Sequence, residues 1–171
     1  MAKVLPRQAI DTRSAAELRM RAILERLPAK WRVIHSVSWQ SPAGKGQDDG
    51  EADFVMIHPD HGVLVVEVKG GRIRTSEGEW FSVDRHGTEH QVKNPFEQAK
   101  RSKYALLRFL SGRMGRVTFP IEHAVALPDV HSPSLGPSGP REIVWDRAID
   151  DDPASTVSAT LNHYGMVASL T

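Results

Sequence analysis

The segment Gly62–Lys69 (Gly-Val-Leu-Val-Val-Glu-Val-Lys) restricts the fold of this chain more than any other part of the sequence. Its run of apolar and β-branched residues is typical of a strand that is buried on both faces. However, Glu67 and Lys69 lie within it, and burial of an unpaired carboxylate or ammonium group is strongly unfavourable. Because residues 67 and 69 of a strand point to the same face, we expect these two charges to have partners on that face.

A second acid is expected beside Glu67. Residues 52–57 predict another strand, and the turn 58–62 joins it to the first. Antiparallel pairing across this turn places Asp53 opposite Glu67, with Cβ atoms about 4.5–5.5 Å apart. Two carboxylates at this distance repel each other unless a proton or a cation lies between them. Mg²⁺ (or Mn²⁺) would fit, because such ions prefer oxygen ligands and Mg²⁺ is often held by one or two carboxylates.

An alternative explanation of these charges needs no metal. In this alternative, Lys69 forms a structural ion pair with Glu67 or Asp53 at the edge of a sheet, where a lysine also discourages aggregation. The chain would then be a purely structural α/β domain in which the three charges satisfy one another. An arrangement with Asp53 and Glu67 on opposite sides of the sheet would favour this alternative.

The remaining patterns predict an α/β fold with one central mixed sheet flanked by helices. Helices are expected over 11–27, where a capping box sets the start at Ser14, over 95–110 after the N-cap Asn94, and over 158–170. Strands are expected over 31–39, 123–127 and 142–145, with a hairpin over 79–83 and 89–92 and polar loops over 41–50 and 128–140. We expect a single domain over residues 1–171, with a core of about 12–150 and a tail, 151–171, that is a linker or helix leading to a further domain absent from this chain.

Composition excludes several kinds of site. The 171 residues include no cysteine, which removes disulfides, thiolate metal sites and cysteine nucleophiles, and which fits a reducing, cytoplasmic compartment. No apolar run approaches about 18 residues and no secretory signal is visible, so we expect no membrane partner. The formal net charge of +1 does not by itself indicate a nucleic-acid partner.

Five features, taken in chain order, resemble a known family. They are Glu17 on the first helix, Asp53 on a strand, the turn Pro59–Gly62, Glu67–Lys69 at the end of an apolar strand, and Asn94–Gln98 (Asn-Pro-Phe-Glu-Gln) at a helix start. Together they look like the PD-(D/E)xK nuclease superfamily, and more closely like its nuclease-related domain (NERD) family, over roughly residues 12–127. The resemblance implies a restriction-endonuclease-like core in the order helix, strand, strand, strand, helix, strand.

The resemblance also implies a role for each site residue. Asp53 and Glu67 would hold Mg²⁺ or Mn²⁺, helped by the backbone carbonyl of Val68. Lys69 would orient or activate the attacking water and offset charge on the transition state. Gln98, on the second long helix, would help to shape the catalytic site.

Glu17 would reach into the catalytic site from the first helix, to a water or a second ion. It also has a structural explanation, because it is the third helical residue of the capping box that begins at Ser14. The two alanines before it stand where members of the family often carry glycine. Gln98 has the corresponding alternative of an exposed helix residue. The nearby basic cluster is either a DNA-contacting surface or the solvated face of a helix, and consists of Lys100, Arg101 and Lys103.

We therefore expect a divalent-metal-dependent deoxyribonuclease that hydrolyses phosphodiester bonds in DNA, in DNA processing or repair. The alternative is a non-catalytic nucleic-acid-binding or accessory module that keeps the nuclease fold and is attached to a helicase or another partner. The near-neutral charge motivates the alternative. The complete set of two acids and a lysine favours the enzyme.

Overall fold

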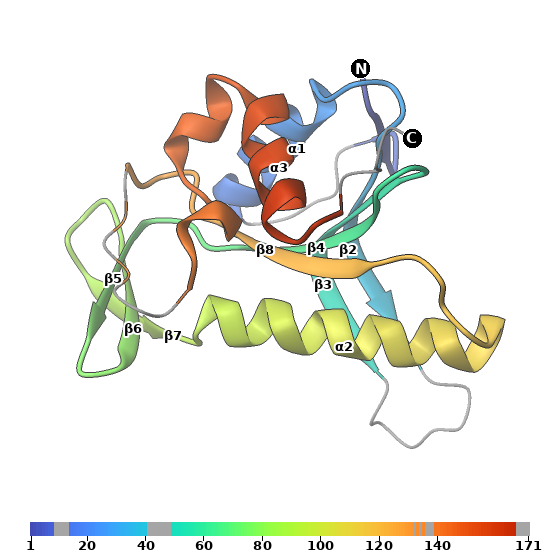
Figure 1. Cartoon of the computed structure of the whole chain (residues 1–171). Helices are drawn as coiled ribbons and strands as arrows, with labels where there is room; N and C mark the ends of the chain where they lie inside the picture. The colour runs from blue at the N-terminus through green and yellow to red at the C-terminus, as the bar shows by residue number, and fades with distance from the viewer. Residues whose placement is uncertain (9–13, 41–48, 132, 134, 136–138, 167–171) are drawn as a thin grey trace.

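A mixed sheet of six strands forms the centre of the computed structural model, which describes residues 1–8, 14–40, 49–131, 133, 135 and 139–166. The strands lie in the order β1, β2, β3, β4, β8, β9 (Figure 1). Their bounds are β1 Lys3–Leu5, β2 Arg32–Trp39, β3 Gly50–His58, β4 Gly62–Val68, β8 Ile121–Ala126 and β9 Val144–Trp145. The β2–β3 and β3–β4 pairs are antiparallel and the other pairs are parallel, which confirms the predicted mixed α/β fold.

Helices cover both faces of this sheet. The helices α1 (Ala15–Glu25) and α3 (Pro153–His163) lie on one face, and the long helix α2 (Pro95–Met114) crosses the other (Figure 1). The strand β4 therefore has two apolar faces, as its sequence predicts. Its residues Leu64, Val66 and Val68 belong to the core under α1 and α3, whereas Val63 and Val65 pack in the core under α2.

The pairing of β3 with β4 follows the predicted register, but it ends earlier than expected. Ile57 pairs with Val63 and Phe54 pairs with Val66, and the ladder stops there. On the other side of β3, the ladder with β2 skips the position of Asp53, opposite Ser36, which has a positive φ of 55°. Within the described residues, Asp53 is therefore not paired with a residue of β2 or of β4, and the predicted direct pair of Asp53 with Glu67 is not formed.

A second, smaller sheet stands beside the start of α2 (Figure 1). It contains β5 (Arg72–Ser76), β6 (Glu79–Val83) and β7 (Glu89–Val92), so the predicted hairpin gains a third strand. Trp80 of β6 is buried, and its ring centroid lies 5.7 Å from that of Phe96 in α2. This aromatic contact attaches the small sheet to the rest of the molecule.

The other predicted elements differ mainly in their bounds. The predicted strand 142–145 is a 3₁₀ turn, Arg141–Ile143, followed by the two residues of β9. The predicted helix 158–170 begins earlier, at Pro153, because Asp152 caps its first turn, and residues 167–170 lie outside the described part of the chain. Most of the predicted loop 41–50 also lies outside it. No helix in the described part is long and apolar enough to cross a membrane.

Candidate active site

At the position where the pairing of β3 with β4 ends, the side chain of Asp53 forms a hydrogen bond with the backbone of β4. Its Oδ2 atom accepts a hydrogen bond from the backbone N–H of Val68, at 2.7 Å. The next backbone N–H, that of Lys69, donates in the opposite direction, to the carbonyl of Ala126 in β8 at 2.9 Å. The carboxylate of Asp53 therefore takes the position that a strand carbonyl would occupy, which satisfies Val68 and fixes the carboxylate beside the end of β4.

Glu67 lies on the face of β4 that is covered by α2. The residue is buried, with a relative exposure of 8%, and its Oε1 atom accepts a hydrogen bond from Nζ of Lys69 at 2.7 Å. The two residues thus share a face, as the strand periodicity predicts. The Glu67–Lys69 ion pair of the structural alternative is also present. A charge-assisted pair of this kind is compatible with catalysis, because it leaves Lys69 beside the two acids.

Burial is the main influence on both acids. Burial, with the nearby charges of Glu67 and Glu17, raises the pKa of Asp53 from 3.8 to about 7, against the opposing effects of the Val68 N–H and of Lys69. Burial also raises the pKa of Glu67, while the charge and hydrogen bond of Lys69 lower it. The charge of Glu67 therefore disfavours the ionisation of Asp53, and a cation between the two carboxylates would relieve this repulsion.

Glu17 performs the capping function with its backbone and keeps its side chain for another contact. Its N–H donates to Oγ of Ser14 at 3.2 Å, which is the helix cap predicted from the sequence. Its carboxylate Oε2 lies 3.1 Å from Nε2 of His35, a residue of β2 that is only 1% exposed. The charge of Glu17 also raises the pKa of Asp53, so this carboxylate contributes to the same negative region.

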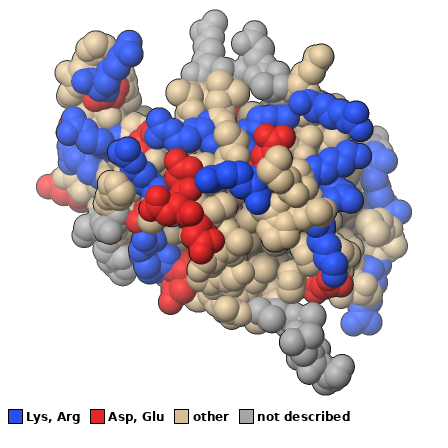
Figure 2. Space-filling view, turned by 90° about the horizontal axis from the view of Figure 1, so that it is seen from above, with Lys and Arg blue, Asp and Glu red and all other residues tan. Residues whose placement is uncertain are grey.

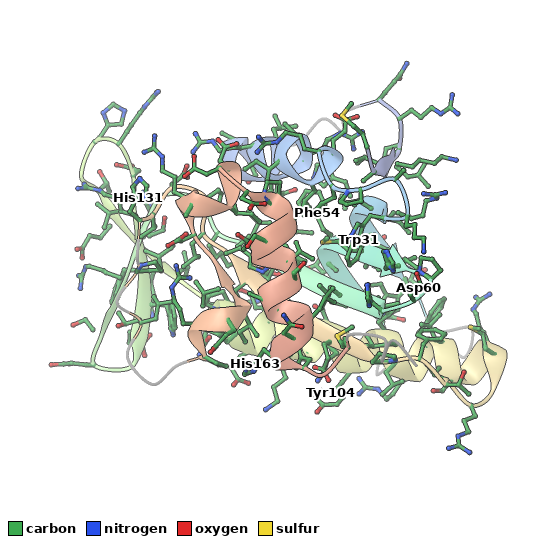
Figure 3. The ribbon with its side chains drawn as sticks, turned by 45° about the horizontal axis from the view of Figure 1, so that its top comes forward. Trp31, Phe54, Asp60, Tyr104, His131 and His163 are labelled. Carbon is green, nitrogen blue, oxygen red and sulfur yellow. The ribbon has the colours of Figure 1, made fainter. Side chains whose placement is uncertain are left out.

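His35 contacts the predicted site residue Glu17, although its sequence pattern does not single it out. Its ring stacks on Phe54, with centroids 4.5 Å apart, in the core layer between the sheet and α1 (Figure 3 labels Phe54). Because a carboxylate only accepts hydrogen bonds, Nε2 of His35 carries the hydrogen that points at Glu17. In the sequence, His35 is a single histidine in a predicted strand of alternating apolar residues. A buried histidine with a structural hydrogen bond would give the same pattern.

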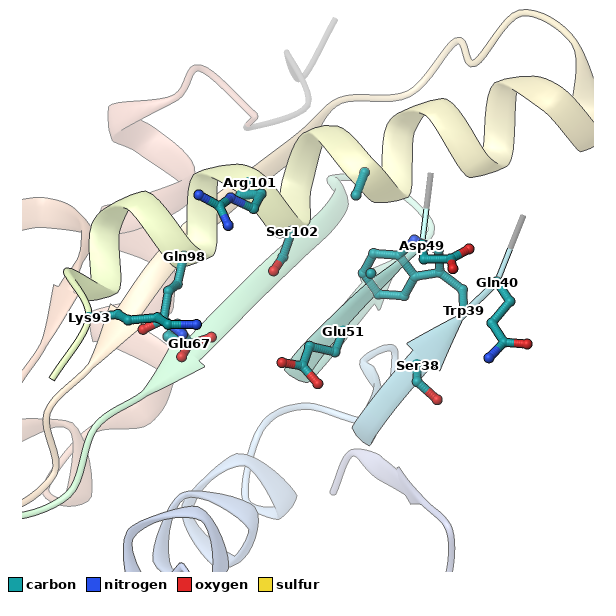
Figure 4. Close-up of a pocket in the computed structure, with 12 residues that line it drawn as sticks. Ser38, Trp39, Gln40, Asp49, Glu51, Glu67, Lys93, Gln98, Arg101 and Ser102 are labelled. Carbon is teal, nitrogen blue, oxygen red and sulfur yellow. The ribbon is translucent and has the colours of Figure 1, made fainter. Parts of the chain in front are cut away.

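Gln98 stands on α2 across from Glu67, and a cavity of about 410 Å³ opens between α2 and the strand ends (Figure 4). Its Oε1 atom is buried and has no hydrogen-bond partner within the described residues. The cavity is lined by Ser38, Trp39, Gln40, Asp49, Gly50, Glu51, Glu67, Lys93, Gln98, Arg101, Ser102 and Ala105. Gln98 is therefore part of the wall of the site, and it is not an exposed helix residue.

The basic cluster of α2 does not form one surface. Arg101 lines the cavity and Lys100 is exposed, whereas Nζ of Lys103 pairs with Glu122 of β8 at 2.8 Å and is largely covered. Figure 2, which views the molecule from the side of α1 and α3, shows basic and acidic side chains interspersed over that face. Of the three residues, Arg101 is the one that lines the same cavity as Glu67.

The donor atoms at the end of β4 fit a hard divalent cation. Within the described residues, no group of three or more His, Asp or Glu side chains lies together as a metal cluster. Mg²⁺ does not require such a group, because it commonly binds through one or two carboxylates and keeps several waters. Asp53 and Glu67 supply two carboxylates, and Val68, whose N–H donates to Asp53, directly follows Glu67 in β4.

A mixed sheet that gathers two acids and a lysine where β3 and β4 separate is consistent with a nuclease-like core. The family model of the nuclease-related domain matches residues 12–128, and the chain therefore belongs to this family. This range contains every predicted site residue and the whole of α2. No curated protein and no solved structure matches the chain.

Proposed function

We propose that this nuclease-related domain is a metal-dependent nuclease that hydrolyses phosphodiester bonds in DNA. The observation that carries the proposal is that the half-buried Asp53 and the buried Glu67 lie so close together that the charge of Glu67 raises the pKa of Asp53, with Lys69 beside Glu67. Proteins rarely keep buried like charges without a function, because the arrangement is costly. A divalent cation and an anionic phosphate would together balance this set of charges.

Each residue has a distinct task in this proposal. Asp53 and Glu67 would hold Mg²⁺ or Mn²⁺ with the carbonyl of Val68, and the bound ion would supply a more acidic water and stabilise charge on the phosphate. The hydrogen bond from Val68 to Asp53 keeps that carboxylate in position. Lys69 would exchange part of its contact with Glu67 for the attacking water or the phosphate. Gln98 lines the cavity beside Glu67, and its buried Oε1 atom has no partner within the described residues.

The test is cleavage of end-labelled DNA, single-stranded and duplex, with Mg²⁺, Mn²⁺ or EDTA. We expect cleavage that requires the ion and falls by at least about 100-fold in Glu67→Gln and in Lys69→Ala. Glu77→Gln is the matched control, because Glu77 is exposed in the β5–β6 turn. Cleavage that persists in EDTA, or that is unchanged in both site variants, would contradict the proposal. DNA binding without cleavage would instead indicate the accessory module that works with a helicase or another partner.

A further expected result concerns His35, which positions Glu17. In His35→Leu the buried packing on Phe54 is kept but the hydrogen bond to Glu17 is lost. We expect cleavage to fall by roughly tenfold, with a higher Mg²⁺ concentration needed for half-maximal rate. His35→Gln, whose amide can donate from a similar place, should recover part of the loss. An unchanged Mg²⁺ dependence in His35→Leu would show that His35 only fills the core.

A further inference from the structure

The cavity beside Glu67 extends beyond the proposed catalytic residues Asp53, Glu67 and Lys69, and its other walls suggest a binding site. Its volume of about 410 Å³ lies in the range of small-ligand pockets. One wall is a single stripe of α2, because Gln98, Arg101, Ser102 and Ala105 follow helical spacing. The facing wall comes from the end of β2 and the start of β3 (Figure 4).

Two buried polar atoms at this cavity are unsatisfied. Trp39 is only 5% exposed, and its indole Nε1 has no hydrogen-bond partner within the described residues. The Oε1 atom of Gln98 is in the same condition. Buried polar groups are almost always paired. Because both residues line this cavity, a rotation of either side chain toward the cavity would let its free polar group pair with a ligand.

The indole of Trp39 is also held rigidly. A Cβ atom added to Gly50 would meet the ring at 2.3 Å, so the ring lies directly against the backbone of β3. A ring that is fixed in this way loses little conformational entropy when a ligand packs on it. Only glycine at position 50 allows this close approach, which explains the residue type there.

The charges at the cavity are divided between its two walls. The helix side carries the cations Lys93 and Arg101, both exposed, and the strand side carries the acids Asp49, Glu51 and Glu67 (Figure 4). An anionic backbone would therefore follow the helix side. A flat group with hydrogen-bond donors and acceptors would enter the space toward Trp39, as an unpaired nucleobase does in proteins that bind single strands.

We propose that this cavity takes one unpaired nucleotide of the DNA strand, next to the phosphate that is cut. This inference rests on the proposed nuclease function and specifies its substrate class as single-stranded DNA or a duplex end that frays. A base within an intact duplex is stacked and paired, so it would have to leave the helix at a considerable cost before it could enter.

Binding measured without cleavage tests the inference. In a Lys69→Ala background, we would measure the fluorescence anisotropy of a labelled single-stranded oligonucleotide and of the matching duplex. Ser102→Phe fills the cavity from α2 and should weaken single-strand binding by at least about fivefold, while duplex binding changes less. Ser111→Phe, an exposed position further along α2, is the matched control and should leave both affinities unchanged. Equal single-strand affinity in the two folded variants would overturn the inference.

Cross-linking provides a measurement that needs no variant in the cavity. A photoreactive thymidine analogue placed throughout a single strand should cross-link to peptides that contain Trp39 or residues 98–105. Cross-links elsewhere only, or equal cross-linking from intact duplex, would overturn the inference. If the protein cuts DNA but Ser102→Phe has no effect on binding, only the proposed nucleotide site is contradicted. If Ser102→Phe weakens binding but the protein does not cut DNA, the nucleotide site is supported and the proposed nuclease activity is contradicted.

Discussion

Replacing Asp53 by asparagine is expected to abolish DNA cleavage and, at the same time, to make the metal-free protein more stable above neutral pH. The loss of cleavage should be roughly 1,000-fold, because the site keeps its shape but loses one of its two metal-binding carboxylates. Shape is kept because the amide oxygen of asparagine can accept the same hydrogen bond from Val68.

The gain in stability follows from the raised pKa of Asp53. Burial and the charge of Glu67 raise this pKa from 3.8 to about 7, so the folded state holds the proton more tightly than the unfolded state does. The stability linked to this proton is fully present below about pH 4 and is lost as the pH rises to about 7. Asparagine does not ionise in this pH range, so the stability of Asp53→Asn should not fall as the pH rises.

Thermal melting in EDTA measures this effect. We expect Asp53→Asn to melt roughly 3–6 °C above the parent chain at pH 8 and close to it at pH 4. Asp129→Asn is the matched control. Like Asp53, Asp129 accepts a hydrogen bond from a backbone N–H, that of Gly71 at 2.9 Å, but it also forms an ion pair with Arg19. It should melt at or below the parent temperature. A stability gain of Asp53→Asn that is equal at pH 4 and pH 8 would contradict the explanation.

Replacing Lys69 by methionine is expected to have the opposite effect on stability. Glu67 is 8% exposed, and without Lys69 its charge has no cationic partner among the described residues. Removal of one partner from a buried ion pair costs about 3–5 kcal/mol. Because the side chain of Lys69 is 21% exposed, we expect a smaller loss, roughly 2–3 kcal/mol at pH 8. The pKa of Glu67 rises when Lys69 is removed, so the loss shrinks as the pH falls and Glu67 takes up a proton.

A double-mutant cycle separates this charge effect from packing. Glu67→Gln/Lys69→Met removes both charges and should recover most of the stability that Lys69→Met loses. Mg²⁺ should also raise the melting temperature of Lys69→Met, because a bound cation replaces the missing one, while cleavage stays at least about 100-fold reduced. Additive losses in the double variant would show that Glu67 and Lys69 do not interact, and would contradict the ion pair of the structure.

The sequence alone determined the central part of this protein. The apolar run of β4, its short turn to β3 and the two-residue period of strands predict the burial of β4 on both faces, the pairing of Phe54 with Val66 and the common face of Glu67 and Lys69. These are local properties, because a strand register follows from the turn that joins the strands. The small strand β5 was missed because its polar residues lack an apolar pattern.

The tertiary structure alone decided how the charges meet. The pairing of β3 with its neighbours is interrupted at Asp53, so its carboxylate accepts a hydrogen bond from Val68 and does not lie opposite Glu67 in the ladder. The side chain of Glu17 contacts His35. Lys103 turns to Glu122, and the cavity forms where α2 crosses the strand ends. These contacts join residues far apart in the chain, and their geometry depends on how helices pack on the sheet. The segment Gly62–Lys69 therefore determined which charges need partners, and only the folded chain determined which groups are those partners.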